Sequence, residues 1–327
     1  MKVVNHKSTL ILFLAIAAQL FVGCSKSDDN TPNNTTQIEA SFTINDSDDL
    51  LVGQVITFNN TSTFEGSNIS YTWNFGDDSQ ISSQDNPSHS YVELGDYVVT
   101  LTATVGNTED TFSEELLISL TSDITGRNTL TEELEQLDNK IMVCAHRGQY
   151  ENAPENTLLS INDAINQSIR MVELDVRQTQ DGELVLMHDA TINRTTNGSG
   201  EVDEMTFQEL QQFNLFKEDG TLTTQKIPSL REVLESSRGE IYLDLDIDDK
   251  APYNKVYQLV KQYGMLNQVL FYSSEFNDVN NLYQTNENII GMPIIRNQND
   301  FDIYDNSNLN LSIVHYTNSS FNNDLVN

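Results

Sequence analysis

The strongest constraint on the fold is the regular alternation of strand-like apolar runs with helix-like stretches from Ile141 onward. Strands that alternate with helices are typical of a parallel α/β architecture. The predicted strands are Ile141–Ala145, Val172–Val176, Ile241–Leu245, Gln268–Phe271, Ile289–Ile295 and Leu311–Tyr316. The predicted helices are Glu155–Ser168, Thr206–Phe213, Leu230–Ser236, Tyr253–Tyr263 and Phe276–Tyr283. If these strands form a barrel, their C-terminal ends converge on one mouth, where a site is expected.

Residues 38–120 show a different pattern, in which short alternating strands are broken by polar turns, as in a β-sandwich. Three segments resemble the PKD domain in order and spacing: YTWNFGDDS (Tyr71–Ser79), NPSHSY (Asn86–Tyr91) and GDYVVTLTATV (Gly95–Val105). The resemblance implies a spacer or a module that contacts glycans or proteins, with core anchors at Trp73, Phe75 and Tyr97. His89 is predicted to be structural. Residues 121–140 form a predicted linker, in which Thr129-x-x-Glu132 would cap a short helix.

The first residues have the layout of a bacterial export signal. Met1–Gly23 combines a positive start with an apolar run that is too short to span a membrane comfortably. Cys24 resembles the lipidated cysteine of bacterial lipoproteins, and residues 24–37 are polar enough to form a flexible tether. We therefore expect a lipid anchor on Cys24 in the cell envelope, at the outer membrane of a Gram-negative, Bacteroidetes-like bacterium. A simple cleaved signal is the alternative.

The formal net charge of −32 argues strongly against a nucleic-acid backbone as a partner, because like charges repel. It also requires that local positive charge or a metal hold any anionic substrate. The two cysteines, Cys24 and Cys144, are far apart in the sequence and imply no disulfide framework. Cys144 lies in a predicted buried strand, where an inert thiol is expected.

The stretch from Met171 to Asp189 concentrates acidic residues and a histidine around one predicted hairpin. Strand geometry points Glu173 and Asp175 to the same side, where the two carboxylates repel each other unless a cation binds. Asp181-Gly182 makes a tight turn, and the returning strand ends at His188. This pattern predicts a metal site with a proton-transfer residue beside it. Solvated carboxylates with an incidental histidine are the alternative.

Together these motifs resemble the glycerophosphodiester phosphodiesterase family over roughly a hundred residues. In order they are His146-Arg147-Gly148, Pro154-Glu155-Asn156-Thr157, Glu173–Asp175, Asp181-Gly182, His188-Asp189, Arg194–Gly200 and Ile227–Leu234. The resemblance implies a (β/α)8 TIM barrel that cleaves a phosphodiester with a divalent cation. It also implies roles for particular residues: His146 and His188 as the general acid/base pair, Glu173 and Asp175 as metal ligands, and Arg147 as a phosphate contact.

The chemistry of these residue types agrees with those roles. Imidazoles titrate near neutrality, so two of them can remove one proton and donate another. A site of carboxylate oxygens suits Mg²⁺ or Ca²⁺ rather than zinc. The guanidinium of Arg147 can hold a phosphate with two parallel hydrogen bonds, and Gly148 has no side chain that would obstruct an anion.

The third predicted strand departs from the family pattern, which has an acidic residue followed two positions later by lysine. Asp244 occupies the acidic position and is the preferred third metal ligand. Asp246 stands where the lysine is expected and is the alternative ligand. Unless Lys250 folds back or Asp246 binds the metal, this exchange of charge should weaken phosphate binding. His315, at the end of the sixth predicted strand, is expected to be structural.

The expected function is hydrolysis of glycerophosphodiesters to glycerol 3-phosphate and an alcohol. The alternatives are a phosphodiesterase that acts on a phospholipid or glycan phosphodiester, and a non-catalytic surface binding lipoprotein. Residues 141–327 supply roughly 190 residues, whereas a TIM barrel usually needs about 250, and the family's late tryptophan-containing strand is missing. The barrel domain is therefore predicted to be C-terminally incomplete.

Overall fold

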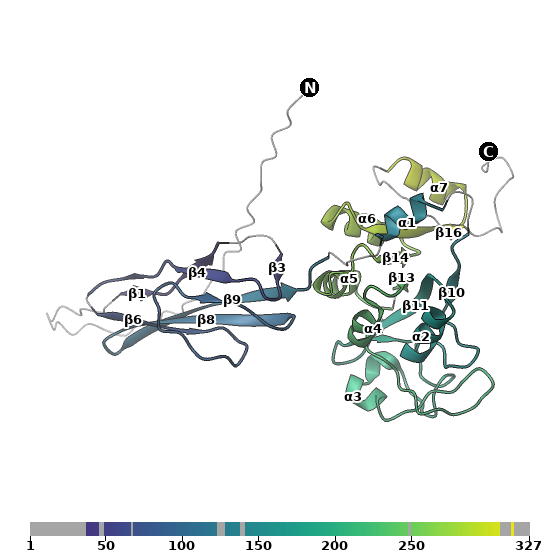
Figure 1. Cartoon of the computed structure of the whole chain (residues 1–327), viewed down its shortest axis with the longest axis horizontal. Helices are drawn as coiled ribbons and strands as arrows, with labels where there is room; N and C mark the ends of the chain where they lie inside the picture. Colours follow the sequence, from purple (N-terminus) through teal and green to yellow (C-terminus); the bar gives the residue numbers. More distant parts are fainter. Residues whose placement is uncertain are drawn as a thin grey trace, which may run out of the picture.

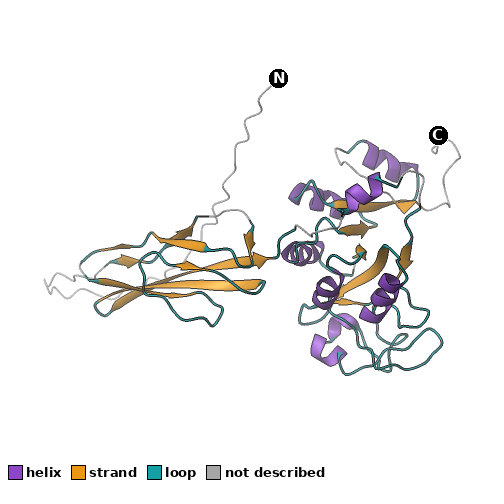
Figure 2. Cartoon of the chain, in the orientation of Figure 1, coloured by secondary structure: helices purple, strands orange, loops and turns teal. Residues whose placement is uncertain are grey.

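The chain forms an all-β unit followed by an α/β unit in the computed structural model (Figure 1 and Figure 2). The structure describes residues 37–45, 49–66, 68–122, 128–137, 141–247, 250–307 and 315–316. The predicted signal segment Met1–Gly23, Cys24 and all of the tether except Gln37 lie outside these residues. Within them, no helix is both long and apolar enough to cross a membrane.

The N-terminal unit consists of two antiparallel sheets and a short strand pair. The strand orders are β2-β4-β7 and β3-β9-β8-β6, and β1 pairs with β5. The bounds are β1 Ile38–Glu39, β2 Phe42–Ile44, β3 Leu50–Leu51, β4 Ile56–Asn60, β5 Thr63–Phe64, β6 Ile69–Asn74, β7 Ser88–His89, β8 Gly95–Val105 and β9 Thr108–Ser119. One parallel contact, between β3 and β9, interrupts the otherwise antiparallel pairing. The prediction of an all-β domain is confirmed.

Aromatic side chains from both sheets share one hydrophobic core. Trp73 and Phe75 are buried in it, as predicted. Tyr97 is only partly buried and stacks on Tyr91, with 4.2 Å between the ring centroids. His89 stacks on Phe75, also at 4.2 Å, which is a packing contact in keeping with a structural role.

The C-terminal unit is a curled parallel sheet of the TIM-barrel type that makes about half a barrel (Figure 1). The parallel order is β10-β11-β13-β14-β15-β16, and β12 pairs antiparallel with β11. The strands are β10 Cys144–His146, β11 Met171–Gln178, β12 Leu184–Leu186, β13 Tyr242–Asp246, β14 Val269–Ser273, β15 Ile290–Ile295 and β16 His315–Tyr316. Among the described residues, β10 and β16 are the two open edges of the sheet.

Helices follow most of the parallel strands, as the alternation predicts. They are α1 Leu130–Glu135, α2 Leu158–Asn166, α3 Phe207–Leu210, α4 Leu230–Ser237, α5 Tyr253–Gln262, α6 Phe276–Thr285 and α7 Gln298–Asp305, with a 3₁₀ turn at Val202–Glu204. The helix α2 begins three residues later than predicted, because Thr157 caps it in a capping box with Ser160. The first strand begins at Cys144 rather than Ile141, because its partner strand begins at Met171, directly opposite Cys144.

The two faces of the parallel strands have different surroundings. One face packs against the helices and forms the main core, which includes Val172, Leu174, Leu243 and Leu245. The alternate residues point to the inside of the half-barrel. At the N-terminal ends of the strands, Leu130 of α1 covers this inner face, in a cluster with Met171, Tyr242, Leu270 and Ile290. The inner face is therefore apolar at one end, which leaves the other end for polar residues.

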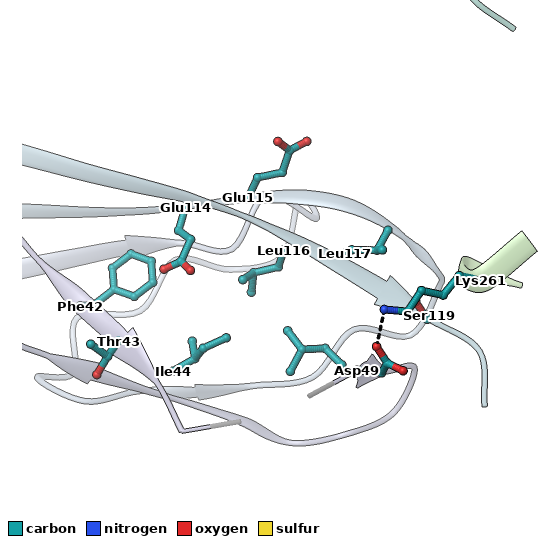
Figure 3. Close-up of a pocket in the computed structure, with 11 residues that line it drawn as sticks. Phe42, Thr43, Ile44, Asp49, Glu114, Glu115, Leu116, Leu117, Ser119 and Lys261 are labelled. Atoms are coloured by element: carbon teal, nitrogen blue, oxygen red, sulfur yellow. Dashed lines mark ion pairs between the residues drawn. The ribbon is translucent and has the colours of Figure 1, made fainter. Parts of the chain in front are cut away.

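The two units touch where β9 leads into the connector. Lys261 of α5 pairs with Asp49 (2.7 Å), and the Leu120 amide donates to the Gln262 carbonyl (2.8 Å). Figure 3 shows Lys261 reaching a pocket of the N-terminal unit that Phe42 and Glu114 also line. This pocket does not include any of the predicted catalytic or metal-binding residues.

Candidate active site

Four carboxylates lie on the inner face of two adjacent parallel strands. β11 and β13 pair in a register that sets Glu173 opposite Asp244 and Asp175 opposite Asp246. Oxygen atoms of Glu173, Asp175 and Asp246 lie within 4.8 Å of one another. Close carboxylates repel, and an all-oxygen donor set suits Mg²⁺ or Ca²⁺. These three residues therefore fit a divalent cation, which would supply positive charge beside a substrate phosphate.

A buried oxygen without a hydrogen-bond partner, Oδ1, distinguishes Asp244 from the other three carboxylates. Desolvation, and then the charges of Glu173 and Asp246, raise the pKa of Asp244 well above its usual range. The oxygens that lie together in the structure thus include that of Asp246 and not that of Asp244. From the sequence, Asp244 was the preferred third metal ligand and Asp246 the alternative. Desolvation and the charge of Asp175 also raise the pKa of Glu173 to about 7.

Lys250 folds back from the loop after β13 and lies against this group. Its ammonium donates to Asp175 Oδ1 (2.6 Å) and to Asp246 Oδ2 (2.8 Å). Burial alone would raise the pKa of Asp175, but the Lys250 charge and the hydrogen bonds from Lys250 and Asn156 bring it below its ordinary value. The charge exchange that Asp246 introduces is therefore compensated four residues further along the chain.

The turn after β10 holds His146 and Arg147 beside the carboxylates. His146 Nε2 lies 3.8 Å from Glu173 Oε2, and the imidazole is 65% exposed. The Arg147 amide donates to the same Glu173 oxygen (2.9 Å), with Arg147 in the left-handed region at φ +58°. The Arg147 guanidinium donates to Glu155 (3.1 Å), and its Nε lies 3.5 Å from Asp175. The residue that was predicted to bind phosphate thus faces the carboxylate group.

Packing and backbone conformation both require a glycine at position 148. Its φ is +80°, and a Cβ at this position would lie 2.3 Å from Ser160 Oγ of α2. The Ser160 hydroxyl also donates to the Arg147 carbonyl (3.2 Å). The structure therefore gives this glycine a packing role, because a Cβ would meet a helix of the same domain.

His188 is held from two sides at the end of the β12 hairpin. Its Nδ1 pairs with Asp189 Oδ1 (2.7 Å), and Arg177 donates to its backbone carbonyl (3.0 and 2.8 Å). Arg194 binds Asp189 through two nitrogens and Glu155 through two nitrogens. The Arg194 hydrogen bonds lower the pKa of Asp189 to about 2. Because a carboxylate accepts from Nδ1, the Nε2 atom of His188 is the nitrogen left for a reacting group.

His146 lies within electrostatic range of His188. The pKa of His146 is lowered by desolvation first, then by Arg147, and the charge of His188 contributes in the same direction.

Cys144 is exposed at the sheet edge, so the expectation of a buried thiol is wrong. Surrounding protein atoms, then Asp244 and Glu173, nevertheless raise its thiol pKa, which disfavours a thiolate nucleophile.

Several residues that shape the site were not predicted from the sequence as site residues. Asn156, at φ +54°, donates to Asp175 Oδ2 (2.8 Å) and accepts from the Asp175 amide (3.1 Å). Glu155, Asp189 and Arg194 form the ionic link between Arg147 and His188 described above. All four residues lie inside the motifs that carried the family resemblance. His315 lies on β16, and its ring is 5.5 Å from that of Tyr272, which stands opposite Asp246 in the register of β13 and β14.

The fold and this arrangement define a half-barrel domain with a phosphodiesterase-type site behind a β-sandwich. Residues 146–291 match the Glycerophosphoryl diester phosphodiesterase family, and residues 41–112 match the PKD domain. The chain therefore carries a domain of the glycerophosphoryl diester phosphodiesterase family, preceded by a PKD domain.

Relatives of known name match the C-terminal domain. A glycerophosphodiester phosphodiesterase of Caldanaerobacter subterraneus is 34% identical over 146 residues, which are 42% of this chain and 59% of that protein. Human glycerophosphodiester phosphodiesterase 1 is 35% identical over 130 residues, 39% of each chain. A solved glycerophosphoryl diester phosphodiesterase from Parabacteroides distasonis has a TM-score of 0.49 and 29% identity, covering 55% of this chain and 66% of its own. The chain thus spans between about two fifths and two thirds of these proteins.

Proposed function

We propose that the C-terminal domain hydrolyses glycerophosphodiesters to glycerol 3-phosphate and an alcohol with the help of a bound divalent cation. One observation carries the proposal. His146, His188 and the carboxylates of Glu173, Asp175 and Asp246 occur together in a domain whose relatives are named glycerophosphodiester phosphodiesterases. A bound cation would neutralise negative charge on the phosphate and so make nucleophilic attack easier.

The two histidines would divide the proton transfers. The attacking hydroxyl or water must lose a proton, and the leaving alkoxide must gain one. His188 Nε2 can take part in one transfer because Asp189 occupies Nδ1 at 2.7 Å. The exposed His146 would serve the other transfer from the opposite side of the phosphate. Arg147 would turn part of its guanidinium to a non-bridging oxygen, where a charged hydrogen bond is strong.

The test is the release of glycerol 3-phosphate from glycerophosphocholine, measured with and without EDTA. We expect release that EDTA abolishes and that added Mg²⁺ or Ca²⁺ restores. His188→Ala should lower turnover by at least about a hundredfold. His89→Ala is the control, since His89 lies in the N-terminal unit and pairs with Asp77, and it should keep full turnover. A folded protein without EDTA-sensitive release would rule out this function and leave the surface-binding alternative. Release from phospholipid or glycan phosphodiesters only would replace the substrate class.

We also propose that a lipid on Cys24 holds the protein at the outer membrane of a Gram-negative cell envelope, with the PKD domain free to contact a glycan or a protein. The layout of Met1–Gly23 supports this location. Metabolic labelling with a fatty acid should mark the wild type but not Cys24→Ser. Equal labelling of the two proteins would refute the anchor.

A further inference from the structure

The Lys250 ammonium lies beside the carboxylates of Asp175 and Asp246, where a divalent cation would be expected. Its ammonium contacts Asp175 at 2.6 Å and Asp246 at 2.8 Å, and only 12% of the side chain is exposed. The backbone fixes this position, because the Lys250 amide donates to Ile247 (2.9 Å) and its carbonyl accepts from the Gln178 amide (3.1 Å). The loop after β13 therefore delivers a positive charge to two of the three oxygen donors.

A divalent cation and the Lys250 ammonium would compete for the same oxygens. Asp175 Oδ2 already accepts from Asn156 (2.8 Å), and Arg147 Nε lies 3.5 Å away, so Oδ1 is the oxygen that Lys250 occupies. Asn156 forms hydrogen bonds with both the side chain and the backbone amide of Asp175. Asp175 is therefore the less mobile partner of the Asp175–Lys250 pair. The lysine, on a flexible four-carbon stem, is the partner that can move away.

We propose that Lys250 is an exchangeable cation of the active site and a further phosphate-binding residue. It neutralises Asp175 and Asp246 while no divalent cation is bound, and it turns to the phosphate of the substrate when one is. Two adjacent cations repel, and a phosphate between them removes that repulsion. The exchange would thus link phosphate binding to cation binding. This inference rests on the proposed function.

The test is a pair of binding measurements on the full chain with Lys250→Met, in which the two affinities should change in opposite directions. Removal of the competing ammonium should tighten Mg²⁺ or Ca²⁺ binding by about tenfold or more in titration calorimetry. At saturating cation, glycerol 3-phosphate should bind about tenfold or more weakly, because a charged hydrogen bond is lost. A purely structural lysine would weaken both or neither.

Two further variants serve as controls. Lys255→Met removes the same charge from an exposed lysine whose ammonium contacts the Gly182 carbonyl, so both affinities should stay at the wild-type values. Lys250→Arg keeps the charge and should keep the cation affinity within about threefold of wild type. It also gives a folded reference if Lys250→Met does not fold.

Three outcomes would overturn the inference. Unchanged or weaker cation binding in Lys250→Met, while the wild type still hydrolyses its substrate, would refute the exchange and leave the proposed function standing. Unchanged glycerol 3-phosphate binding would refute the phosphate contact. A wild type that neither binds a divalent cation nor hydrolyses a phosphodiester would remove the proposed function itself, and the inference with it.

Discussion

Without divalent cations, the C-terminal domain should lose stability as the pH rises, and Glu173→Gln should remove the part of that loss that Glu173 causes. Desolvation and the charge of Asp175 raise the pKa of Glu173 from 4.5 to about 7 in the folded domain. The unfolded state therefore loses this proton first, so the stabilisation is complete below about pH 4.5 and disappears as the pH rises through about 7. A difference of roughly 2.5 pKa units, at about 1.4 kcal/mol each, gives about 3 to 4 kcal/mol.

Calorimetric unfolding of the full chain in EDTA, from pH 4 to pH 8.5, measures this effect. For a domain of this size about 3 to 4 kcal/mol corresponds to roughly 6–16 °C, so Glu173→Gln should melt that much higher than wild type near pH 8 and equally near pH 4. The glutamine oxygen can still accept from the Arg147 amide. Glu201→Gln changes an exposed glutamate, so its melting temperature should fall with pH as steeply as that of the wild type. The fluorescence of Trp73, in the N-terminal unit, should not change over this pH range. Parallel pH profiles for wild type and Glu173→Gln would refute the reasoning.

Three further predictions follow from the site. His188→Ala should abolish turnover but keep the rise in melting temperature that Mg²⁺ or Ca²⁺ causes, and loss of that rise would contradict a purely proton-transfer role. Asp246→Asn should weaken cation binding by about tenfold or more, whereas Asp244→Asn should change it little, because the oxygens of Glu173, Asp175 and Asp246 lie together and burial disfavours the charged form of Asp244; the opposite ranking in calorimetry would restore Asp244 as the third ligand. Gly148→Ala should destabilise the domain by about 2 kcal/mol in thermal or denaturant unfolding, because its Cβ would meet Ser160 at a positive φ; unchanged stability would mean that α2 can shift away.

The alternation of strands and helices predicted most of the parallel sheet, because most of the strands are apolar on their helix-facing side and are followed by a helix. The element bounds were less predictable. Residues 141–143 have a strand-like composition. Their partner strand β11 begins only at Met171, which lies opposite Cys144, so no described residue of β11 pairs with them. The start of α2 depends on the Thr157 hydroxyl, which accepts from the Ser160 amide at 3.1 Å. Both bounds depend on tertiary register or a single cap rather than on periodicity.

The inner face of the sheet could be predicted, but the depth of each residue along it could not. Strand alternation correctly puts Asp244 and Asp246 on one face. It does not reveal that Asp244 lies one step nearer the apolar end, opposite Glu173, where desolvation raises the pKa of its carboxyl well above the usual range. The position of Lys250 likewise depends on a loop that returns to β11. A ligand preference taken from spacing alone therefore chose the more deeply buried of two equivalent carboxylates.

Because the chain carries a net charge of −32, a substrate anion could bind only where positive charge is available locally. Two arginines beside the site already form ion pairs with carboxylates. Arg194 holds Glu155 through two bonds of 2.8 Å, whereas Arg147 reaches the same carboxylate at 3.1 Å. Because Arg194 satisfies most of the Glu155 charge, Arg147 can turn to a phosphate without leaving that carboxylate unpaired. Arg194 itself is fixed between Glu155 and Asp189 and cannot make the same move without releasing His188. Among the described residues beside the carboxylates, Arg147 and Lys250 are therefore the positive groups that could turn to a phosphate.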